Sequence, residues 1–211
     1  MTAGRGEVGI LNLEMGNLRS VSNAVHSLGF DHRLIDQASD IDRLSHLIIP
    51  GVGAFHTAMR RMESGGVTKA VRDFAATGRP VLGLCLGMQL LAERGDEGEP
   101  TQGLAFVPAR VARLDAERVQ AIPHVGWNSV RITRPHPVFA GVKGGVDFYF
   151  VHSYRCVMDE DNDVLAVTDC GEEFPSVIGR ANVLGFQFHP EKSQSNGLRL
   201  LENFCEWDGR C

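Results

Sequence analysis

The sequence lacks a regular cysteine framework. Five cysteines occur among its 211 residues, which is an odd number, and no two of them form a C-x-x-C pair. This usage argues against a set of structural disulfides and against a zinc site. It fits the reducing environment of the cytoplasm, which is where we expect the protein to work.

Long apolar runs and blocks of like charge are also missing. One of the longest apolar runs, HLIIPGVGAF, is broken by Pro and Gly well short of the roughly 20 residues that a membrane span needs. The opening MTAGRGEVGI has no apolar export segment, so we expect no export. The formal net charge is -5 and the basic residues are scattered, which leaves no basic footprint for nucleic acid. We expect small-molecule chemistry or a protein partner, and neither a membrane nor nucleic acid.

Short β-branched runs alternate with segments of helical period in the first half of the chain. Ser39 followed by Asp42 resembles a capping box and predicts a brief helix. Continuous apolar strands are typical of a parallel sheet with both faces covered. The predicted strands are 7–13, 32–35, 46–51 and 80–84, and the predicted longer helices are 17–28, 55–62 and 67–76.

The pattern changes beyond Gly103 to strand-like stretches separated by turn residues, which predicts a mixed or antiparallel extension. An amphipathic closing helix is predicted at 197–207. We therefore predict an α/β fold in a single domain, residues 1–211, with a mixed, mostly parallel sheet flanked by helices. The predicted strands of the extension are 104–114, 128–133, 147–156 and 163–170.

The motif GLCLG, residues 83–87, predicts a nucleophile. It has the form G-x-C-x-G, the cysteine version of the elbow in which a nucleophile occupies a sharp turn from a strand into a helix. Glycines suit that turn, because a side chain on either flank would crowd the backbone. Cys85 would lie at a helix N-terminus, and a cationic neighbour would favour its thiolate further. The alternative is that Cys85 is a small buried hydrophobic residue.

A second motif, VLGFQFHPEKS, supplies a candidate base. Residues 183–188 predict a strand that runs out at His189, where Pro190 stops the pairing. His189 and Glu191 are two residues apart, so in an extended chain both side chains leave the same face. Glu191 can then orient the imidazole while the other ring nitrogen faces the thiol, which is the logic of a catalytic triad. A surface histidine beside a glutamate is the alternative.

Acyl transfer also needs hydrogen-bond donors for a developing oxyanion. The backbone N–H of Leu86, the residue after the nucleophile, is one candidate. Another is the run PGVGAF, where Gly51, Val52 and Gly53 end a predicted strand and two glycines let the backbone approach a ligand closely. An ordinary turn is the alternative. Position 56 is His, so this loop is not a dinucleotide fingerprint, and no phosphate-loop motif occurs.

Together the motifs resemble a known family. PGVGAF, GLCLGMQLL, IPHVGWN, FYFVHSY and GFQFHPEKS occur in the order found in class I, triad-type glutamine amidotransferases. PHVGWN and FYFVHSY narrow the resemblance to the glutaminase subunits of imidazole glycerol phosphate synthase. The resemblance extends from MGNLRSV to LLENF, which is nearly the whole chain.

The resemblance implies that Cys85 attacks the side-chain amide of L-glutamine and forms a thioester. Water then hydrolyses the thioester, and the products are glutamate and ammonia. His189 would take the thiol proton and protonate the departing ammonia, while Glu191 holds the imidazole.

The resemblance also implies the surrounding residues. Val52 or Gly53, together with Leu86, would supply the oxyanion donors. From the residues alone, Gln89 could equally face solvent on a helix, and His152 could equally be a core histidine to which we assign no proton transfer. The glutamine pocket would be lined by Gly51, Gln89, Glu97, His152, Ser153 and Tyr154.

The resemblance also implies a protein partner. It implies neither a metal nor an organic cofactor. Ammonia released into water becomes ammonium and is no longer nucleophilic. The family docks on a (β/α)8-barrel cyclase that receives ammonia internally and makes imidazole glycerol phosphate and aminoimidazole carboxamide ribotide in histidine biosynthesis. We expect Asn17, Pro123 and Trp127 at the docking surface, because large aromatic side chains often anchor interfaces. The alternative for Trp127 is that it fills the core.

Two departures from the family's pattern lie near the expected partner face. The first loop reads NLEMGN where the family has D-Y-G-x-G-N, and Ala121 and Val125 stand where the family commonly has Lys and Met. Neither departure touches the triad. They leave open a paralogous glutaminase that feeds a related barrel synthase, for example in sugar amination. A stand-alone cysteine hydrolase and a catalytically silent binding subunit also stay open as hypotheses.

Overall fold

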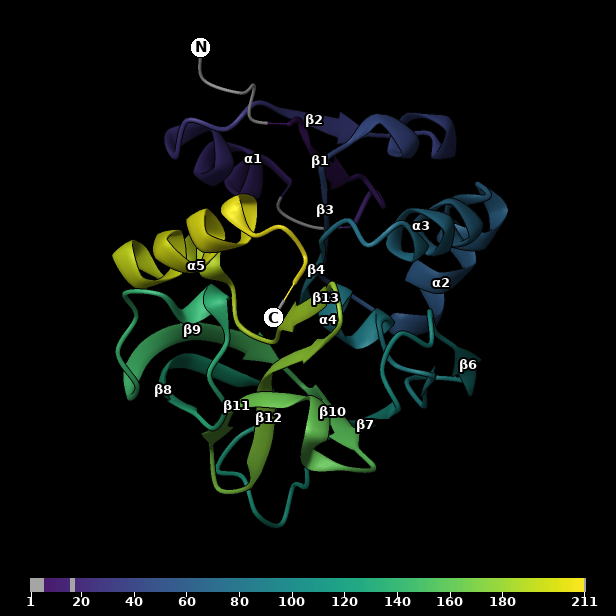
Figure 1. Cartoon of the computed structure of the whole chain (residues 1–211). Coiled ribbons are helices and arrows are strands. Elements are labelled where there is room, and N and C mark those ends of the chain that lie inside the picture. The colour runs from purple at the N-terminus through teal and green to yellow at the C-terminus, as the bar shows by residue number, and fades with distance from the viewer. Residues whose placement is uncertain (1–5, 16–17, 211) are drawn as a thin grey trace.

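A mixed sheet forms the centre of the molecule. The computed structural model describes residues 6–15 and 18–210, and in them nine strands are joined in the order β2-β1-β3-β4-β13-β12-β11-β8-β9 (Figure 1). The first five are parallel: β2 (His32–Ile35), β1 (Val8–Leu11), β3 (His46–Gly51), β4 (Val81–Cys85) and β13 (Val183–Phe186). The other four are joined in antiparallel pairs: β12 (Glu173–Arg180), β11 (Val164–Asp169), β8 (His124–Ile132) and β9 (Val146–His152).

Helices cover both faces of the parallel half. Figure 1 shows α1 (Leu18–Ser27) and α5 (Gln194–Glu206) on one side, and α2 (Phe55–Ser64) and α3 (Val67–Ala76) on the other. Each pair adds its apolar side chains to a separate core, for example Val25 and Leu201 in one and Met59 and Phe74 in the other. Because both faces are covered, the central strand β4 is buried along its whole length, as its continuous apolar sequence predicts.

A smaller sheet packs against the core of α2 and α3. Its order is β10-β7-β5-β6, with β10 (Tyr154–Met158), β7 (Ala109–Arg113), β5 (Arg94–Gly95) and β6 (Thr101–Gln102). The remaining short elements are α4 (Leu86–Leu90), η1 (Ala38–Arg43), η2 (Pro137–Phe139), η3 (Asp161–Asp163) and η4 (Pro190–Lys192), of which the four labelled η are 3-10 turns.

The structure corrects the predicted second half in three places. The stretch 147–156 forms two strands, because the chain bends at Ser153 and passes from β9 in the large sheet to β10 in the small one. Strand β12 is absent from the prediction, since Pro175 interrupts its apolar pattern, yet β12 pairs with both β11 and β13. The strand predicted at 183–188 ends at Phe186.

The predicted capping box is wrong. The turn η1 begins after Gln37, which makes no capping hydrogen bond through its side chain, and Ser39 already lies inside the turn. A residue with helical backbone angles cannot serve as the N-cap, whose backbone is extended. The brief helix at this place is therefore a 3-10 turn without a side-chain cap.

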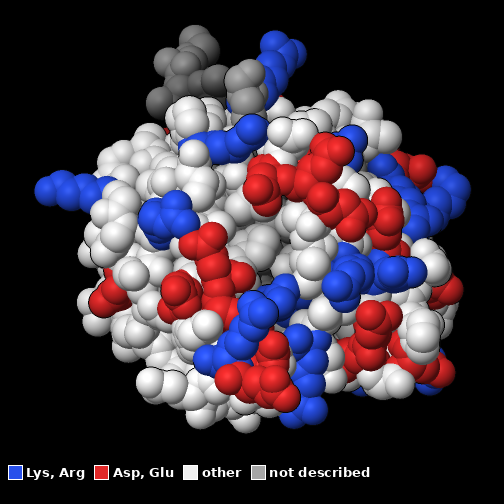
Figure 2. Space-filling model, turned by 90° about the horizontal axis from the view of Figure 1, so that it is seen from below, with Lys and Arg blue, Asp and Glu red and all other residues white. Residues whose placement is uncertain are grey.

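Charges are mixed on the face that Figure 2 shows, which is the lower side of Figure 1. Lys and Arg side chains alternate there with Asp and Glu. This face therefore presents no continuous basic surface of the kind that binds nucleic acid. Among residues 6–15 and 18–210, no helix combines the length and apolar character needed to cross a membrane.

The turn from β4 into α4 depends on close backbone packing at two glycines. A Cβ on Gly83 would lie 2.4 Å from the carbonyl oxygen of Gly87, and a Cβ on Gly87 would lie 1.7 Å from the carbonyl oxygen of Ile49 in β3. Non-bonded carbon atoms prefer separations of about 3.5–4.0 Å. The two glycines that flank Cys85 are thus required by the approach of neighbouring backbones, as the sequence motif predicts.

Gly87→Ala should destabilise the fold strongly. The added methyl group meets the backbone of β3, and overpacking of this kind costs about 3 kcal/mol or more. For a chain of this size, that loss lowers the melting temperature by about 6–12 °C. Gly144→Ala is the matched control, because a Cβ there meets nothing within 4 Å. Denaturant unfolding measures both variants, and equal stability of the two would contradict this account of the turn.

Candidate active site

Cys85 forms the turn between β4 and α4. Its backbone has φ 53° and ψ -108°, a conformation that a residue with a side chain adopts only at an energetic cost. This is the geometry of the nucleophile elbow expected from the motif. The residue is 5% exposed and lines a cavity of about 400 Å³, a size that suits a small molecule.

The cavity gathers most of the predicted site residues from distant parts of the sequence. Gly51 lies outside it, in the wall of a smaller neighbouring cavity that also borders His189 and Glu191. Asn17 lies outside the described residues. The predicted residues that line the main cavity are Val52, Gly53, Cys85, Leu86, Gln89, Glu97, Pro123, His152, Ser153 and Tyr154.

His189 and Glu191 form a buried pair. His189 Nδ1 lies 2.9 Å from Glu191 Oε1, and both side chains are almost fully buried. The contact is the predicted one, but its geometry differs. The chain is no longer in a strand here, and Glu191 lies in the 3-10 turn η4, which begins directly after His189. The turn, rather than a shared face of an extended chain, brings the carboxylate to the ring.

The surroundings of His189 favour its charged form. Burial on its own would lower the pKa of this histidine, but the Cys85 sulfur and the Glu191 carboxylate outweigh that effect and raise the pKa to about 10. Nε2 is buried and forms no hydrogen bond of good geometry within the described residues. The Cys85 sulfur is thus close enough to raise the pKa of the ring, although the two groups form no hydrogen bond of good geometry. An imidazolium beside the sulfur favours the thiolate, the reactive form of cysteine.

Ser193 fixes the backbone of His189. Its hydroxyl donates to the His189 carbonyl oxygen at 2.6 Å and accepts from the Tyr149 N–H at 3.0 Å. The His189 N–H in turn donates to the Tyr149 carbonyl oxygen at 2.9 Å. Ser193 is 1% exposed. Sequence reasoning missed this residue, and the available signal was its place two residues after Glu191, at the end of GFQFHPEKS.

The two backbone segments considered as oxyanion donors lie next to Cys85. Leu86 is the first residue of α4, so its N–H has no partner within that helix. On the other side, Gly51 stands opposite Cys85 in the register of β3 and β4, so the chain that follows Gly51 continues beside the turn. Val52 is the next residue on that side and is 39% exposed.

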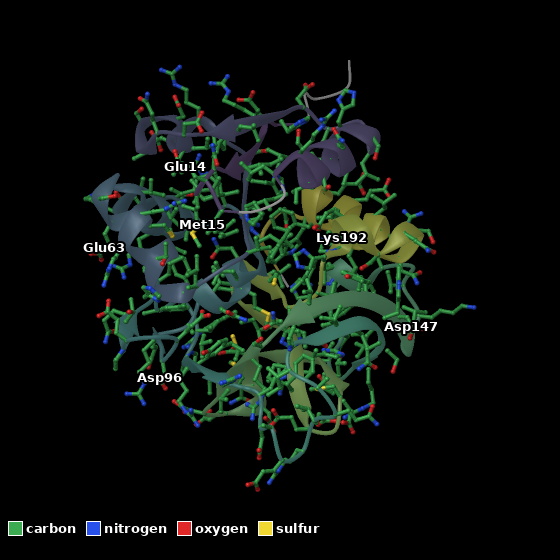
Figure 3. The ribbon with its side chains drawn as sticks, turned by 180° about the vertical axis from the view of Figure 1, so that it is seen from behind. Glu14, Met15, Glu63, Asp96, Asp147 and Lys192 are labelled. Carbon is green, nitrogen blue, oxygen red and sulfur yellow. The ribbon has the colours of Figure 1, made fainter. Side chains whose placement is uncertain are left out.

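The backbone at position 53 requires glycine. Its φ of 108° belongs to a region that residues with side chains rarely adopt. A Cβ at this position would also lie 2.8 Å from the methyl group of Met15. Figure 3 labels Met15 on the loop that follows β1. The first loop of the chain, one of the two departures from the family pattern, therefore contacts the segment proposed to supply an oxyanion donor.

The backbone carbonyl of Tyr154 orients two side chains that line the cavity. The Tyr154 oxygen accepts from His152 Nδ1 and from Gln89 Nε2, each at 2.9 Å. Since a carbonyl oxygen only accepts, His152 Nε2 must accept from His124 Nδ1 at 3.0 Å. Burial lowers the pKa of His152 to about 3, and nearby His124 and His189 add to this against the opposing hydrogen bond with Tyr154. His152 is a neutral wall residue.

Gln89 and Glu97, two further predicted pocket residues, form hydrogen bonds with backbone groups of the protein. Gln89 is 4% exposed, which excludes the solvent-facing alternative. Glu97 accepts a hydrogen bond through Oε2 from the N–H of Phe55 at 2.8 Å, at the first residue of α2. Glu97 therefore satisfies a free N–H at the start of α2 in addition to lining the cavity.

The predicted docking segment is exposed on β8. Trp127 is 47% exposed and Val125 is 55% exposed, so Trp127 does not fill the core. The Trp127 ring packs edge-on against Tyr149, with ring centroids 6.0 Å apart. The Lys192 ammonium lies 5.6 Å from the centre of the Tyr149 ring, and Figure 3 shows Lys192 near the start of α5. Strand β8 thus presents large apolar side chains close to the segment that carries His189.

Comparisons with known proteins agree with this geometry. Residues 10–207 match the family described as glutamine amidotransferase class-I. The chain is 47% identical over 195 residues to imidazole glycerol phosphate synthase subunit HisH of Symbiobacterium thermophilum, covering 92% of this chain and 91% of the relative. The chain belongs to the class-I glutamine amidotransferases and, within them, to the HisH family. The HisH subunit of Moorella thermoacetica is 45% identical over 199 residues, covering 94% of each chain.

Solved structures show the same fold. A crystal structure of a glutamine amidotransferase matches with a TM-score of 0.71 at 25% identity, covering 94% of this chain and 97% of the other. A putative GMP synthase subunit from Thermoplasma acidophilum matches with a TM-score of 0.72 at 18% identity, covering 95% and 92%, and shares the fold alone.

Replacing Glu191 by Gln in this amidotransferase should lower the pKa of His189, because a neutral amide stabilises the imidazolium less than a carboxylate does. The raised pKa stabilises the folded protein fully below about pH 6.5, and this contribution is lost as the pH rises through about 10. In Glu191→Gln the loss should begin at lower pH. NMR of the imidazole resonances measures the titration, with Glu93→Gln on the surface as the control. Identical titrations in the two variants would show that Glu191 does not act on the ring.

Proposed function

We propose that this chain is the glutaminase subunit of an imidazole glycerol phosphate synthase and hydrolyses L-glutamine to glutamate and ammonia. The observation that carries the proposal is Cys85, held in a strained turn at the wall of a small-molecule cavity, with the charged His189 and its carboxylate partner beside it. The identity with HisH subunits over nearly the whole chain supports the assignment to this enzyme.

The first half of the reaction follows from these positions. The Cys85 thiolate attacks the side-chain amide carbon of glutamine, and the carbonyl oxygen becomes an oxyanion. The N–H of Leu86, with that of Val52 or Gly53, stabilises this charge. The His189 imidazolium gives its proton to the amide nitrogen. The C–N bond breaks, ammonia leaves and a thioester remains on the sulfur.

In the second half, His189 is neutral and acts as the base. It takes a proton from a water molecule as the water oxygen attacks the thioester carbon. The same donors stabilise the second oxyanion. When the C–S bond breaks, the thiolate and the imidazolium are restored and glutamate is released. Glu191 keeps Nδ1 of the ring engaged throughout, which leaves Nε2 for both proton transfers.

The ammonia must reach its acceptor without mixing with water, since ammonium is not nucleophilic. We propose that the acceptor lies in a (β/α)8-barrel cyclase that forms imidazole glycerol phosphate and aminoimidazole carboxamide ribotide. The exposed Val125 and Trp127 support docking through β8. Pro123 lines the active-site cavity and a second cavity that also borders Val125, so this surface adjoins the site.

Two broader proposals accompany this function. Residues 1–211 form a single glutamine amidotransferase domain, because both hydrophobic cores pack on the faces of one sheet. The protein works in the cytoplasm, where reducing conditions keep the Cys85 thiol available.

The test is glutamine hydrolysis by the purified chain, alone and with the cyclase subunit and its nucleotide substrate. We expect glutamate to form much faster in the complex than with the chain alone. Cys85→Ala should lower the rate of the complex by at least about 10³-fold, because removal of a nucleophile leaves only the surrounding stabilisation. An unchanged rate in Cys85→Ala would refute the nucleophile, and full turnover without a partner would favour a stand-alone hydrolase.

A substitution on β8 tests the docking surface through the affinity for the cyclase. Trp127→Ala should weaken binding of the cyclase by about 30-fold, which is typical for loss of an aromatic anchor. Leu34→Ala is the control, because Leu34 is 44% exposed but lies on β2 at the opposite edge of the sheet. Equal affinity of the two variants for the cyclase would remove β8 from the interface.

A further inference from the structure

Gln187 is a buried polar residue that no part of the reaction described above uses. It is 0% exposed and lies between the end of β13 and His189. Its backbone N–H donates to the Ser176 carbonyl oxygen at 2.9 Å, so the chain is anchored at this point. Burying a side-chain amide is unfavourable unless the amide is hydrogen-bonded. The partners of this amide therefore indicate why a glutamine stands here.

The side chain of Gln187 contacts two residues of the active site. Its Nε2 lies 3.9 Å from the Cys85 sulfur, and its Oε1 lies 3.2 Å from Gln89 Nε2. Cys85 and Gln89 line the main cavity, whereas Gln187 does not. Gln187 thus contacts Cys85 from the protein interior. The substrate cavity lies on another side of Cys85.

The direction of these hydrogen bonds is fixed by the Tyr154 carbonyl oxygen. It can only accept, so the Gln89 atom that faces it must be the amide nitrogen. The same nitrogen faces Gln187, so the Gln187 atom in contact must be the oxygen. The Gln187 nitrogen is then left to face the sulfur, and one of its N–H groups points to Cys85. The chain of donors runs from Gln187 to Cys85, and from Gln89 to both Gln187 and Tyr154.

This arrangement also determines what Gln89 offers to the cavity. Both N–H groups of its amide are engaged, one by Tyr154 and one by Gln187. The polar atom that remains is Oε1, an acceptor. An acceptor on a residue that lines the cavity suits a ligand group that presents an N–H.

We propose that Gln187 is a positioning residue with two roles: its N–H donates to the Cys85 sulfur and favours the thiolate, and its oxygen fixes the Gln89 amide so that an acceptor is left for the ligand. The second role rests on the proposed glutaminase function, since it concerns the binding of glutamine. The first role concerns the sulfur alone and holds for any reaction of Cys85.

Two variants separate these roles. Gln187→Met keeps the length of the side chain but removes both the donor and the acceptor. Gln187→Glu removes the donor to the sulfur and keeps an acceptor for Gln89. Gln102→Met is the matched control, because Gln102 is exposed on β6 at the edge of the small sheet. Thermal unfolding identifies a variant that fails to fold, in which case the other variant carries the test.

The first measurement is the rate at which iodoacetamide alkylates Cys85 in the full chain between pH 5 and 10, located by peptide mass spectrometry. At pH 7 we expect the rate to fall about tenfold in both Gln187 variants, the effect of losing one hydrogen bond to a charged group. The rate should recover to the wild-type plateau at high pH and stay unchanged in Gln102→Met. A wild-type rate at pH 7 in a folded Gln187→Met chain would overturn the first role. A purely structural role would not move the pH profile.

The second measurement is KM for glutamine in the complex with the cyclase. We expect KM to rise about tenfold in Gln187→Met and to stay near the wild-type value in Gln187→Glu. An unchanged KM in Gln187→Met would overturn the second role. The alkylation needs neither glutamine nor a partner. A complex without glutaminase activity whose alkylation profile still shifts therefore refutes the proposed function and supports the first role of Gln187.

Discussion

The position of the Cys85 sulfur depends on how closely three backbone segments approach one another. The carbonyl oxygen of Ile49 and the backbone at Gly87 leave no room for a Cβ on either flanking glycine. This contact locks the turn between β4 and α4, so the unfavourable φ of Cys85 persists in the folded protein. The central strands are buried on both faces, and their packing supplies the rigidity that the strained turn requires.

Local electrostatics then distinguish Cys85 from Cys156, another buried cysteine. Burial raises the pKa of Cys156 to about 12 against a smaller lowering by Arg155, so Cys156 is inert at neutral pH. Cys85 instead lies near a histidine whose pKa is raised by the sulfur itself and by Glu191. The hydroxyl of Ser193 holds that histidine in place through its backbone. Reactivity follows from these neighbours rather than from the type of residue.

The sequence predicted the parallel half and the elbow well, because both depend on local signals. Apolar strands, helical periods and the glycines around Cys85 each require only neighbouring residues. The contact between His189 and Glu191 was also predicted, although through an extended chain where the structure has a 3-10 turn. Gln187 was missed, because a polar residue within an apolar motif gives no sign of burial until distant strands surround it. Ser193 was missed although it closes the motif that carries His189 and Glu191, because its contacts are with backbone atoms of His189 and Tyr149. The role of the Tyr154 carbonyl was equally hidden, since it is a backbone atom.

The central claim is that one sulfur, Cys85, is the nucleophile. The most direct measurement is mass spectrometry of the chain after incubation with a glutamine-derived electrophile in the presence of the cyclase. The account predicts one adduct per chain, on Cys85, that forms more slowly when excess glutamine competes. An adduct on Cys156 or Cys170 in place of Cys85, or the absence of any adduct in a complex that hydrolyses glutamine, would contradict the account.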